Sequence, residues 1–222
     1  RDHWLALCFA VLVGFVVIIP PMYGKLRFGI DVNNPLNIRF DDEFFYFSRI
    51  HEVLDGHPTI GNAYLFEHKA KPPAPTFLSE YILAQPLRLF KLTVGEGNIL
   101  YDFLLPAIAF ILTYWIFFSI AEKKAIALVS TAILFGFFVG DFARSVSPQF
   151  NFLFWLSQFL FLYRLCVEPH DKKYYVYLIA NAINFGLLFD FNTYYWTYYV
   201  IFFLFLIAIY GLSRNFTKMK HV

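Results

Sequence analysis

The stretch that decides the fold is WLALCFAVLVGFVVII, which covers residues 4–19. It is an unbroken apolar run of about the length that a helix needs to cross a bilayer, and Pro20 and Pro21 follow it. No small-residue cleavage site comes after the run, so it is interpreted as a retained signal anchor. We therefore expect the first helix to cross the membrane and to stop at the two prolines.

The composition extends this interpretation to the whole chain. Of the 222 residues, 59% are hydrophobic and 22% are aromatic, with 30 Phe, which is far above the usage of soluble domains. We predict an all-α polytopic membrane protein with about six spans and no soluble domain. The expected spans are 4–20, 99–120, 125–140, 150–167, 174–190 and 193–212. The last two runs form one re-entrant pair instead if residues 190–192 do not reach the surface.

The distribution of Lys and Arg predicts the orientation, because cytoplasmic loops are enriched in both. With the N-terminus inside, only Arg144 falls in a short outer segment. Residues 24–98 then form one long extracytoplasmic loop, and the protein is expected in the plasma (inner) membrane with its site on the outer face. The short inner segments hold Arg1, Lys123, Lys124, Lys172, Lys173, Arg214, Lys218 and Lys220.

Two amphipathic helices are expected within the long loop. The first begins at Asp42 and ends at Gly56, before Pro58, with an apolar stripe at helical spacing. The second and weaker one covers 77–92. Both are expected to lie at the membrane interface. The stripe of the first helix consists of Phe44, Phe47, Ile50, Val53 and Leu54.

Three adjacent carboxylates, Asp41, Asp42 and Glu43, open the first of these helices. Charges held against a bilayer are costly and need a partner or a function, so the cluster is a site hypothesis. The simpler interpretation is helix capping, because carboxylates accept hydrogen bonds from the free amides of a helix start.

The same region carries a resemblance to a known enzyme class. Asp42-Glu43, followed by Tyr46, Glu52 and Gly56, resembles the Asp-Glu opening of the first outer loop in C-type glycosyltransferases (GT-C). The stretch Tyr64-Leu-Phe-Glu-His-Lys-Ala-Lys71-Pro72-Pro73 is similar to the aromatic and Lys-Pro-Pro part of that loop. Protein O-mannosyltransferases and lipid A aminoarabinose transferases are the most similar branches, over roughly residues 5–150. Because those enzymes have about twice as many spans, the chain is expected to be the N-terminal part of such a module.

The resemblance implies a reaction and a catalytic carboxylate. A carboxylate, Asp42 or Asp41 with Glu43 beside it, would act as general base on an acceptor hydroxyl. The hydroxyl would attack a sugar carried on a polyprenyl phosphate, with inversion at the anomeric carbon. The partners expected are therefore the lipid-linked sugar donor, the bilayer and an extracytoplasmic acceptor, and no nucleic acid.

Cations are expected near the phosphate that leaves. Lys71 is the candidate by resemblance and Arg144 by position, while Tyr46 and Arg49 share the helix face of Asp42 and are expected to line the site. The three cations also have simpler interpretations. Lys71 is then a solvated loop residue, and the two arginines pair locally, Arg144 with Asp141 and Arg49 with Glu52.

The sequence predicts no certain cofactor. His51, His57 and His68 with Glu52 match no zinc spacing. Asp42 and Asp141 are candidates for a divalent cation, Mg²⁺ or Mn²⁺, as in the related oligosaccharyltransferases, whereas the mannosyl and aminoarabinose branches work without one.

Three other functions stay open. An oligosaccharyltransferase-like enzyme would move a whole glycan from a lipid pyrophosphate. A transporter or channel would line a path with Asn181, Asn184 and Asn192, although such proteins place their polar groups near the midplane. A partner subunit without activity of its own is the third.

Overall fold

The computed structural model describes residues 3–33, 41–57, 59, 77–138, 144–167, 172–191 and 193–212. Over these residues the chain is helical and contains no strand, so the predicted all-α class is confirmed. The elements in chain order are α1 (Trp4–Phe28), α2 (Asp41–Leu54), α3 (Leu78–Phe90), α4 (Val94–Ala121), α5 (Lys124–Phe138), the π-helical turn η3 (Ser145–Phe150), α6 (Asn151–Val167), α7 (Lys172–Phe191) and α8 (Thr193–Leu212).

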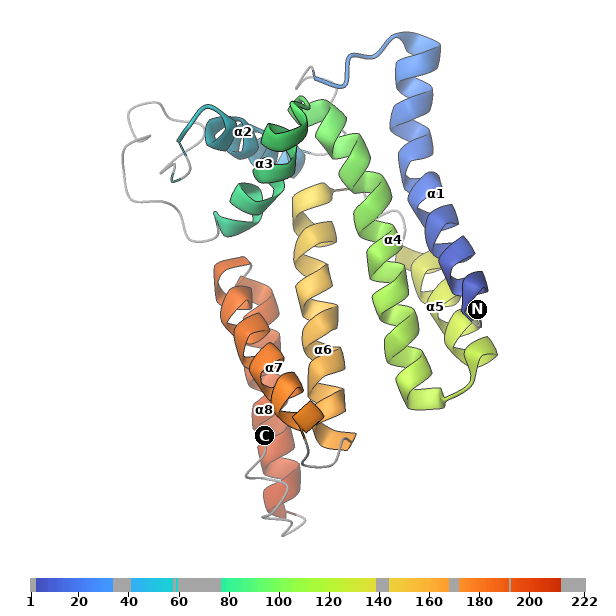
Figure 1. Cartoon of the computed structure of the whole chain (residues 1–222), viewed down its shortest axis with the longest axis vertical. Coiled ribbons are helices and arrows are strands. Elements are labelled where there is room, and N and C mark those ends of the chain that lie inside the picture. The colour runs from blue at the N-terminus through green and yellow to red at the C-terminus, as the bar shows by residue number, and fades with distance from the viewer. Residues whose placement is uncertain are drawn as a thin grey trace.

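Six of the helices run along the long axis of the molecule, and α2 and α3 lie across one end of this bundle (Figure 1). Within the described residues, four segments are long and apolar enough to cross a membrane. Helices α5 and α8 contain shorter apolar segments, Lys124–Phe137 and Tyr194–Ile209. The four long segments are Trp4–Phe28, Val94–Ala121, Val146–Val167 and Lys172–Phe191.

The first helix does not stop where the sequence analysis expects. Pro20 and Pro21 lie inside α1, which continues to Phe28 and ends at Gly29 in the left-handed conformation (φ 64°). Proline is tolerated within membrane helices because neighbouring groups can satisfy the freed carbonyls. Glycine at the end fits the left-handed cap without steric cost.

Helix α4 also begins earlier than the expected span. Thr93 accepts a hydrogen bond from the Glu96 amide at 3.2 Å, and the Glu96 carboxylate accepts one from the Thr93 amide at 2.9 Å. This reciprocal capping box fixes the start of the helix at Val94, five positions before the apolar run at 99.

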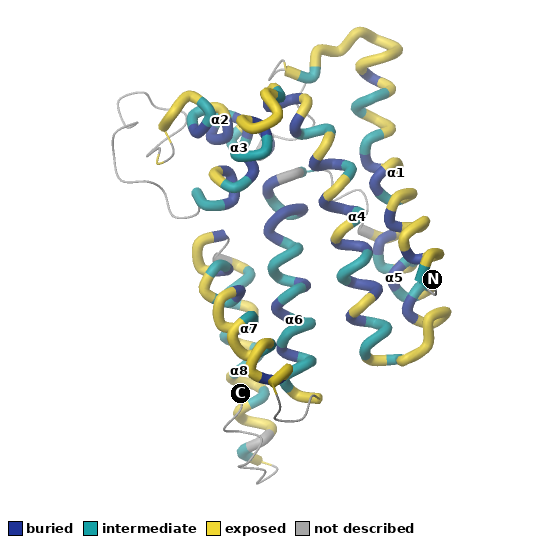
Figure 2. Tube along the Cα trace, in the orientation of Figure 1, coloured by how far each residue is buried: buried dark blue, intermediate teal, exposed yellow. Residues whose placement is uncertain are grey.

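Buried residues line the inward sides of the helices and exposed residues the outward sides, as Figure 2 shows. Many of the exposed residues are large and hydrophobic. One cluster joins α2 and α3 to the upper part of α4 and to η3, with Phe47, Ile50 and Val53 buried in it. These three belong to the apolar stripe expected for residues 42–56, and α2 covers that segment up to Leu54. A second cluster joins α1, α4, α5 and α6 around Ala109 and Phe110.

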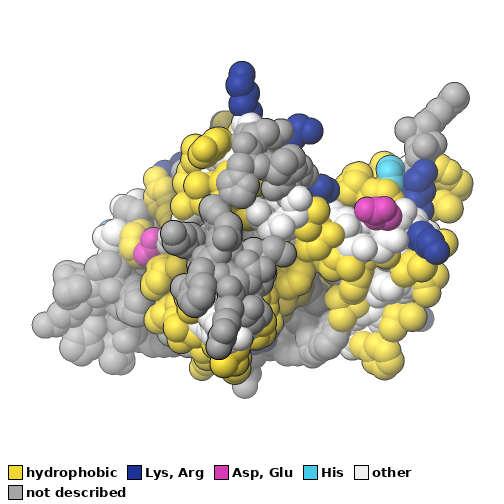
Figure 3. All heavy atoms as spheres, turned by 90° about the horizontal axis from the view of Figure 1, so that it is seen from below, with side chains coloured by type: hydrophobic (Ala, Val, Ile, Leu, Met, Phe, Trp, Pro, Cys, Tyr) yellow, Lys and Arg dark blue, Asp and Glu magenta, His cyan; other side chains and the backbone are white. Residues whose placement is uncertain are grey.

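The end opposite α2 and α3 is seen in Figure 3, where Lys and Arg side chains project from a mostly hydrophobic surface. The turn between α4 and α5 brings Lys123 and Lys124 there, and the start of α7 brings Lys172 and Lys173, all of them exposed.

Candidate functional site

The acidic cluster forms the first turn of α2. Asp41 and Asp42 are the first two residues of this helix, and their side chains lie outside what the structure describes. The Glu43 side chain is described. It is 4% exposed and accepts a hydrogen bond from Asn98 Nδ2 of α4 at 2.9 Å. Glu43 therefore ties the acidic start of α2 to the beginning of the long helix α4.

Further along α2, Arg49 is buried against α3. Its Nη1 lies 3.2 Å from Oε1 of Glu80, and the two side chains are 4% and 2% exposed. The guanidinium also stands 5.1 Å from the ring centre of Phe45. The simpler interpretation of Arg49 named Glu52, which shares its helix, but the ion pair found here crosses to α3.

Burial governs the protonation of Glu80. Removal from water raises the pKa of this carboxyl from 4.5 to about 6, and the nearby Arg49 charge lowers the pKa by a smaller amount. The carboxyl is therefore ionised at neutral pH and becomes neutral in mildly acidic conditions.

Arg144 and Tyr46 lie at the same end of the bundle. Arg144 is half-buried just before η3, and Tyr46 is half-buried on α2. Both interact electrostatically with Tyr195, near the start of α8. A cation just before η3 and a phenol one turn after Asp42 therefore both lie within electrostatic range of the same side chain.

Other buried polar contacts join neighbouring helices at this end of the bundle. Ser79 Oγ donates to Asn151 Oδ1 at 2.7 Å, which joins α3 to α6. Gln149 Nε2 donates to Asp102 Oδ1 at 2.7 Å, which joins η3 to α4. An ionisable side chain inside an apolar helix is expensive and marks a functional candidate. We call the following set the polar layer: Glu43, Arg49, Ser79, Glu80, Asn98, Asp102, Gln149 and Asn151.

The structure brings together part of the site expected from the sequence. Glu43, Tyr46, Arg49 and Arg144 lie at the α2–α3 end of the bundle. Lys71 and Asp141 lie outside the described residues, so their placement remains a prediction.

The polar layer also contains residues that the sequence analysis did not single out, chiefly Glu80 and Asp102. Glu80 occupies the apolar stripe of its own helix, in register with Leu83, Ala84 and Leu87. Asp102 is an acid within an apolar run. The signal for Glu80 is a carboxylate in phase with an apolar stripe, and the signal for Asp102 is a carboxylate inside a span-length apolar run.

No group of three or more His, Cys, Asp or Glu side chains that could hold a metal ion occurs in the described part of the chain. The cation site suggested for Asp42 and Asp141 falls on side chains outside that part.

No protein-family model, curated protein or solved structure matches this chain.

Proposed function

We propose that the protein is a membrane glycosyltransferase of the C-type, transferring a sugar from a polyprenyl-phosphate donor to an extracytoplasmic acceptor. The observation that carries the proposal is the position of the acidic start of α2. It lies at one end of an apolar helical bundle, and Glu43 joins it to α4. A lipid-linked sugar has its reactive carbon at the membrane surface, where such an acid can reach it.

Asp42 is the general base in this proposal. Its carboxylate takes the proton of the acceptor hydroxyl, and the oxygen attacks the anomeric carbon from the face opposite the phosphate. The bond from the anomeric carbon to the phosphate oxygen breaks, and polyprenyl phosphate leaves with the electron pair. Positive charge develops on the sugar ring in the transition state, and carboxylates nearby stabilise it.

Cationic side chains neutralise the negative charge of the leaving phosphate in this proposal. Arg144 supports this role because it shares the neighbourhood of Tyr195 with Tyr46, which lies one turn after Asp42. Lys71 is assigned the same role by its Lys-Pro-Pro context. Asp41 is assigned the capping role in this proposal, whereas the buried Arg49–Glu80 pair holds α2 against α3 and so positions the acidic turn.

The amides inside the bundle favour an enzyme over a transporter. Gln158 donates to Asn181 at 2.8 Å, and Asn184 donates to both Gln158 and the Phe154 carbonyl at 2.8 Å. These groups satisfy one another between α6 and α7, so their hydrogen-bonding capacity is used within the bundle. Asn192, the third residue of that alternative, lies outside the described part of the chain.

Activity of purified protein in vesicles with a polyprenyl-phosphate sugar tests the proposal. Asp42→Asn is expected to lower kcat by about 10²–10⁴-fold, the contribution of a general base, whereas Asp41→Asn costs less. Lys71→Ala is expected to raise the KM for the donor about 10- to 100-fold, the value of one charge-assisted contact, without changing dependence on the acceptor. Wild-type rates in both aspartate variants, with correct insertion, would assign the acidic cluster a structural role.

A further inference from the structure

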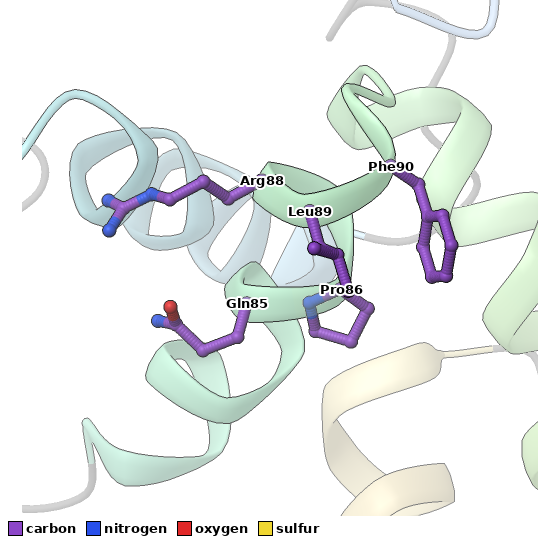
Figure 4. Close-up of a pocket in the computed structure, with 5 residues that line it drawn as sticks. All are labelled: Gln85, Pro86, Arg88, Leu89 and Phe90. Carbon is purple, nitrogen blue, oxygen red and sulfur yellow. The ribbon is translucent and has the colours of Figure 1, made fainter.

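Helix α3 carries a hollow on the side turned away from its buried face. The hollow has a volume of about 660 Å³, is open to the surface and is lined by Gln85, Pro86, Arg88, Leu89 and Phe90. Figure 4 shows Pro86, Leu89 and Phe90 on one side of it, while Gln85 and Arg88 extend from the other. Its surface is therefore apolar on one side and polar on the other.

The apolar side is unusually exposed. Leu89 is 75% exposed and Phe90 is 66% exposed, although the same helix buries Leu83 and Leu87 almost completely. Phe90 precedes the membrane-length segment Val94–Ala121 by only four positions. The exposed pair therefore lies close in sequence to the start of a candidate span, where a membrane interface is expected.

The polar side presents a fixed cation. Arg88 Nη2 donates to the Val53 carbonyl of α2 at 2.6 Å, and Val53 is its only hydrogen-bond partner in the part of the chain that the structure describes. The bond holds the guanidinium at the rim and leaves further N–H groups for an anion, since guanidinium has five. Lys91, three residues after Arg88, is an exposed second cation at the end of the helix.

We propose that this hollow binds one anionic phospholipid of the leaflet next to α2 and α3. The phosphate and headgroup would meet Arg88, and the start of an acyl chain would cover Pro86, Leu89 and Phe90. Charge complementarity selects an anionic lipid over a zwitterionic one, because a juxtamembrane cation attracts the former. Arginine also binds a phosphate through two parallel N–H bonds, which fits a specific site.

The test places a photoreactive benzoylphenylalanine at position 90 of the full chain. The protein is inserted in lipid discs of dioleoylphosphatidylcholine with a minor fraction of dioleoylphosphatidylglycerol, illuminated, and analysed by mass. The proposal expects phosphatidylglycerol adducts to be enriched about fivefold over the bulk composition, the effect of one interfacial cation.

Substitutions at Arg88 separate charge from folding. Arg88→Gln retains a donor for the Val53 carbonyl but is neutral, and should abolish the enrichment, whereas Arg88→Lys should retain most of it. Arg27→Gln is the matched control, because Arg27 is an exposed arginine at the same end of the bundle and the change in net charge is equal.

Two results would overturn the proposal. One is equal enrichment in wild type and Arg88→Gln, which would make the attraction a property of the whole surface. The other is a crosslink from position 90 to a second copy of the chain, which would make the hollow a dimer contact.

Discussion

Arg49 of α2 and Glu80 of α3 form an ion pair with 3.2 Å between Nη1 and Oε1, and both side chains are almost fully removed from water. Both helices belong to the segment between the first two long apolar helices, and neither is itself long enough to span a membrane. A buried ion pair adds little net stability compared with apolar residues of equal volume, because desolvation opposes the attraction. Its effect here is to fix which faces of α2 and α3 meet.

The pair makes stability depend on pH in a defined direction. Burial raises the pKa of Glu80 from 4.5 to about 6, so the folded protein holds this proton more tightly than the unfolded chain. Protonated Glu80 therefore adds to the free energy of unfolding. This stabilisation is fully present below pH 4.5 and is lost as the pH rises through about 6. We predict that Glu80→Gln removes this dependence. Unfolding is measured in detergent micelles. The free energy of unfolding of the variant, relative to wild type, should rise by about 2 kcal/mol between pH 4.5 and pH 7.

The control for that experiment is Glu96→Gln, which removes an exposed carboxylate near the same end of the bundle. Its difference from wild type should not follow the same curve through pH 6. A pH-independent difference for Glu80→Gln would show that Glu80 ionises alike in the folded and unfolded states.

Helices α1 and α4 approach each other closely at Gly14. A Cβ added at this position would lie 2.6 Å from the Phe103 carbonyl oxygen, which is backbone and cannot move aside alone. Gly14→Ala is therefore predicted to lower the free energy of unfolding by about 1–3 kcal/mol, the usual cost of overpacking. Gly136→Ala is the matched control, because nothing lies within 4 Å of a Cβ there. It should stabilise helix α5 by about 0.5–1 kcal/mol.

The sequence predicts the helices better than their contacts. The stripe of Phe47, Ile50 and Val53 identifies α2 because apolar periodicity is local information. The partner of Arg49 is not local. A rule based on i,i+3 spacing predicts Glu52 as the partner. In the structure the partner is Glu80, 31 positions away, because it depends on how two helices pack. The ends of α1 and α4 deviate for a related reason: caps and tolerated prolines, rather than hydropathy, decide where a helix starts and stops.

The amides between α6 and α7 allow a graded test of polar packing. Gln158 is fully buried and bonds to both Asn181 and Asn184, so Gln158→Leu removes two hydrogen bonds and Asn181→Leu removes one. Interhelical hydrogen bonds in membrane proteins contribute about 0.6 kcal/mol on average. We predict a loss of about 1–2 kcal/mol for Gln158→Leu and roughly half of that for Asn181→Leu, measured by unfolding in micelles. Equal losses in both variants would argue against a shared network.

The proposed site requires α2 and α3 to lie outside the cytoplasm, and thiol labelling tests this directly. The background is Cys8→Ser with Cys166→Ser, because both native cysteines are exposed and could react with the reagent. A cysteine is then placed at His57, whose side chain is 63% exposed just after α2, or at Lys123, which is exposed at the opposite end of the bundle. The basic residues near Lys123 predict that this end faces the cytoplasm. An impermeant maleimide added to intact cells should therefore label His57→Cys and leave Lys123→Cys unlabelled until the cells are opened. Labelling of Lys123→Cys in intact cells would invert the orientation, place the acidic turn of α2 in the cytoplasm and exclude an extracytoplasmic acceptor.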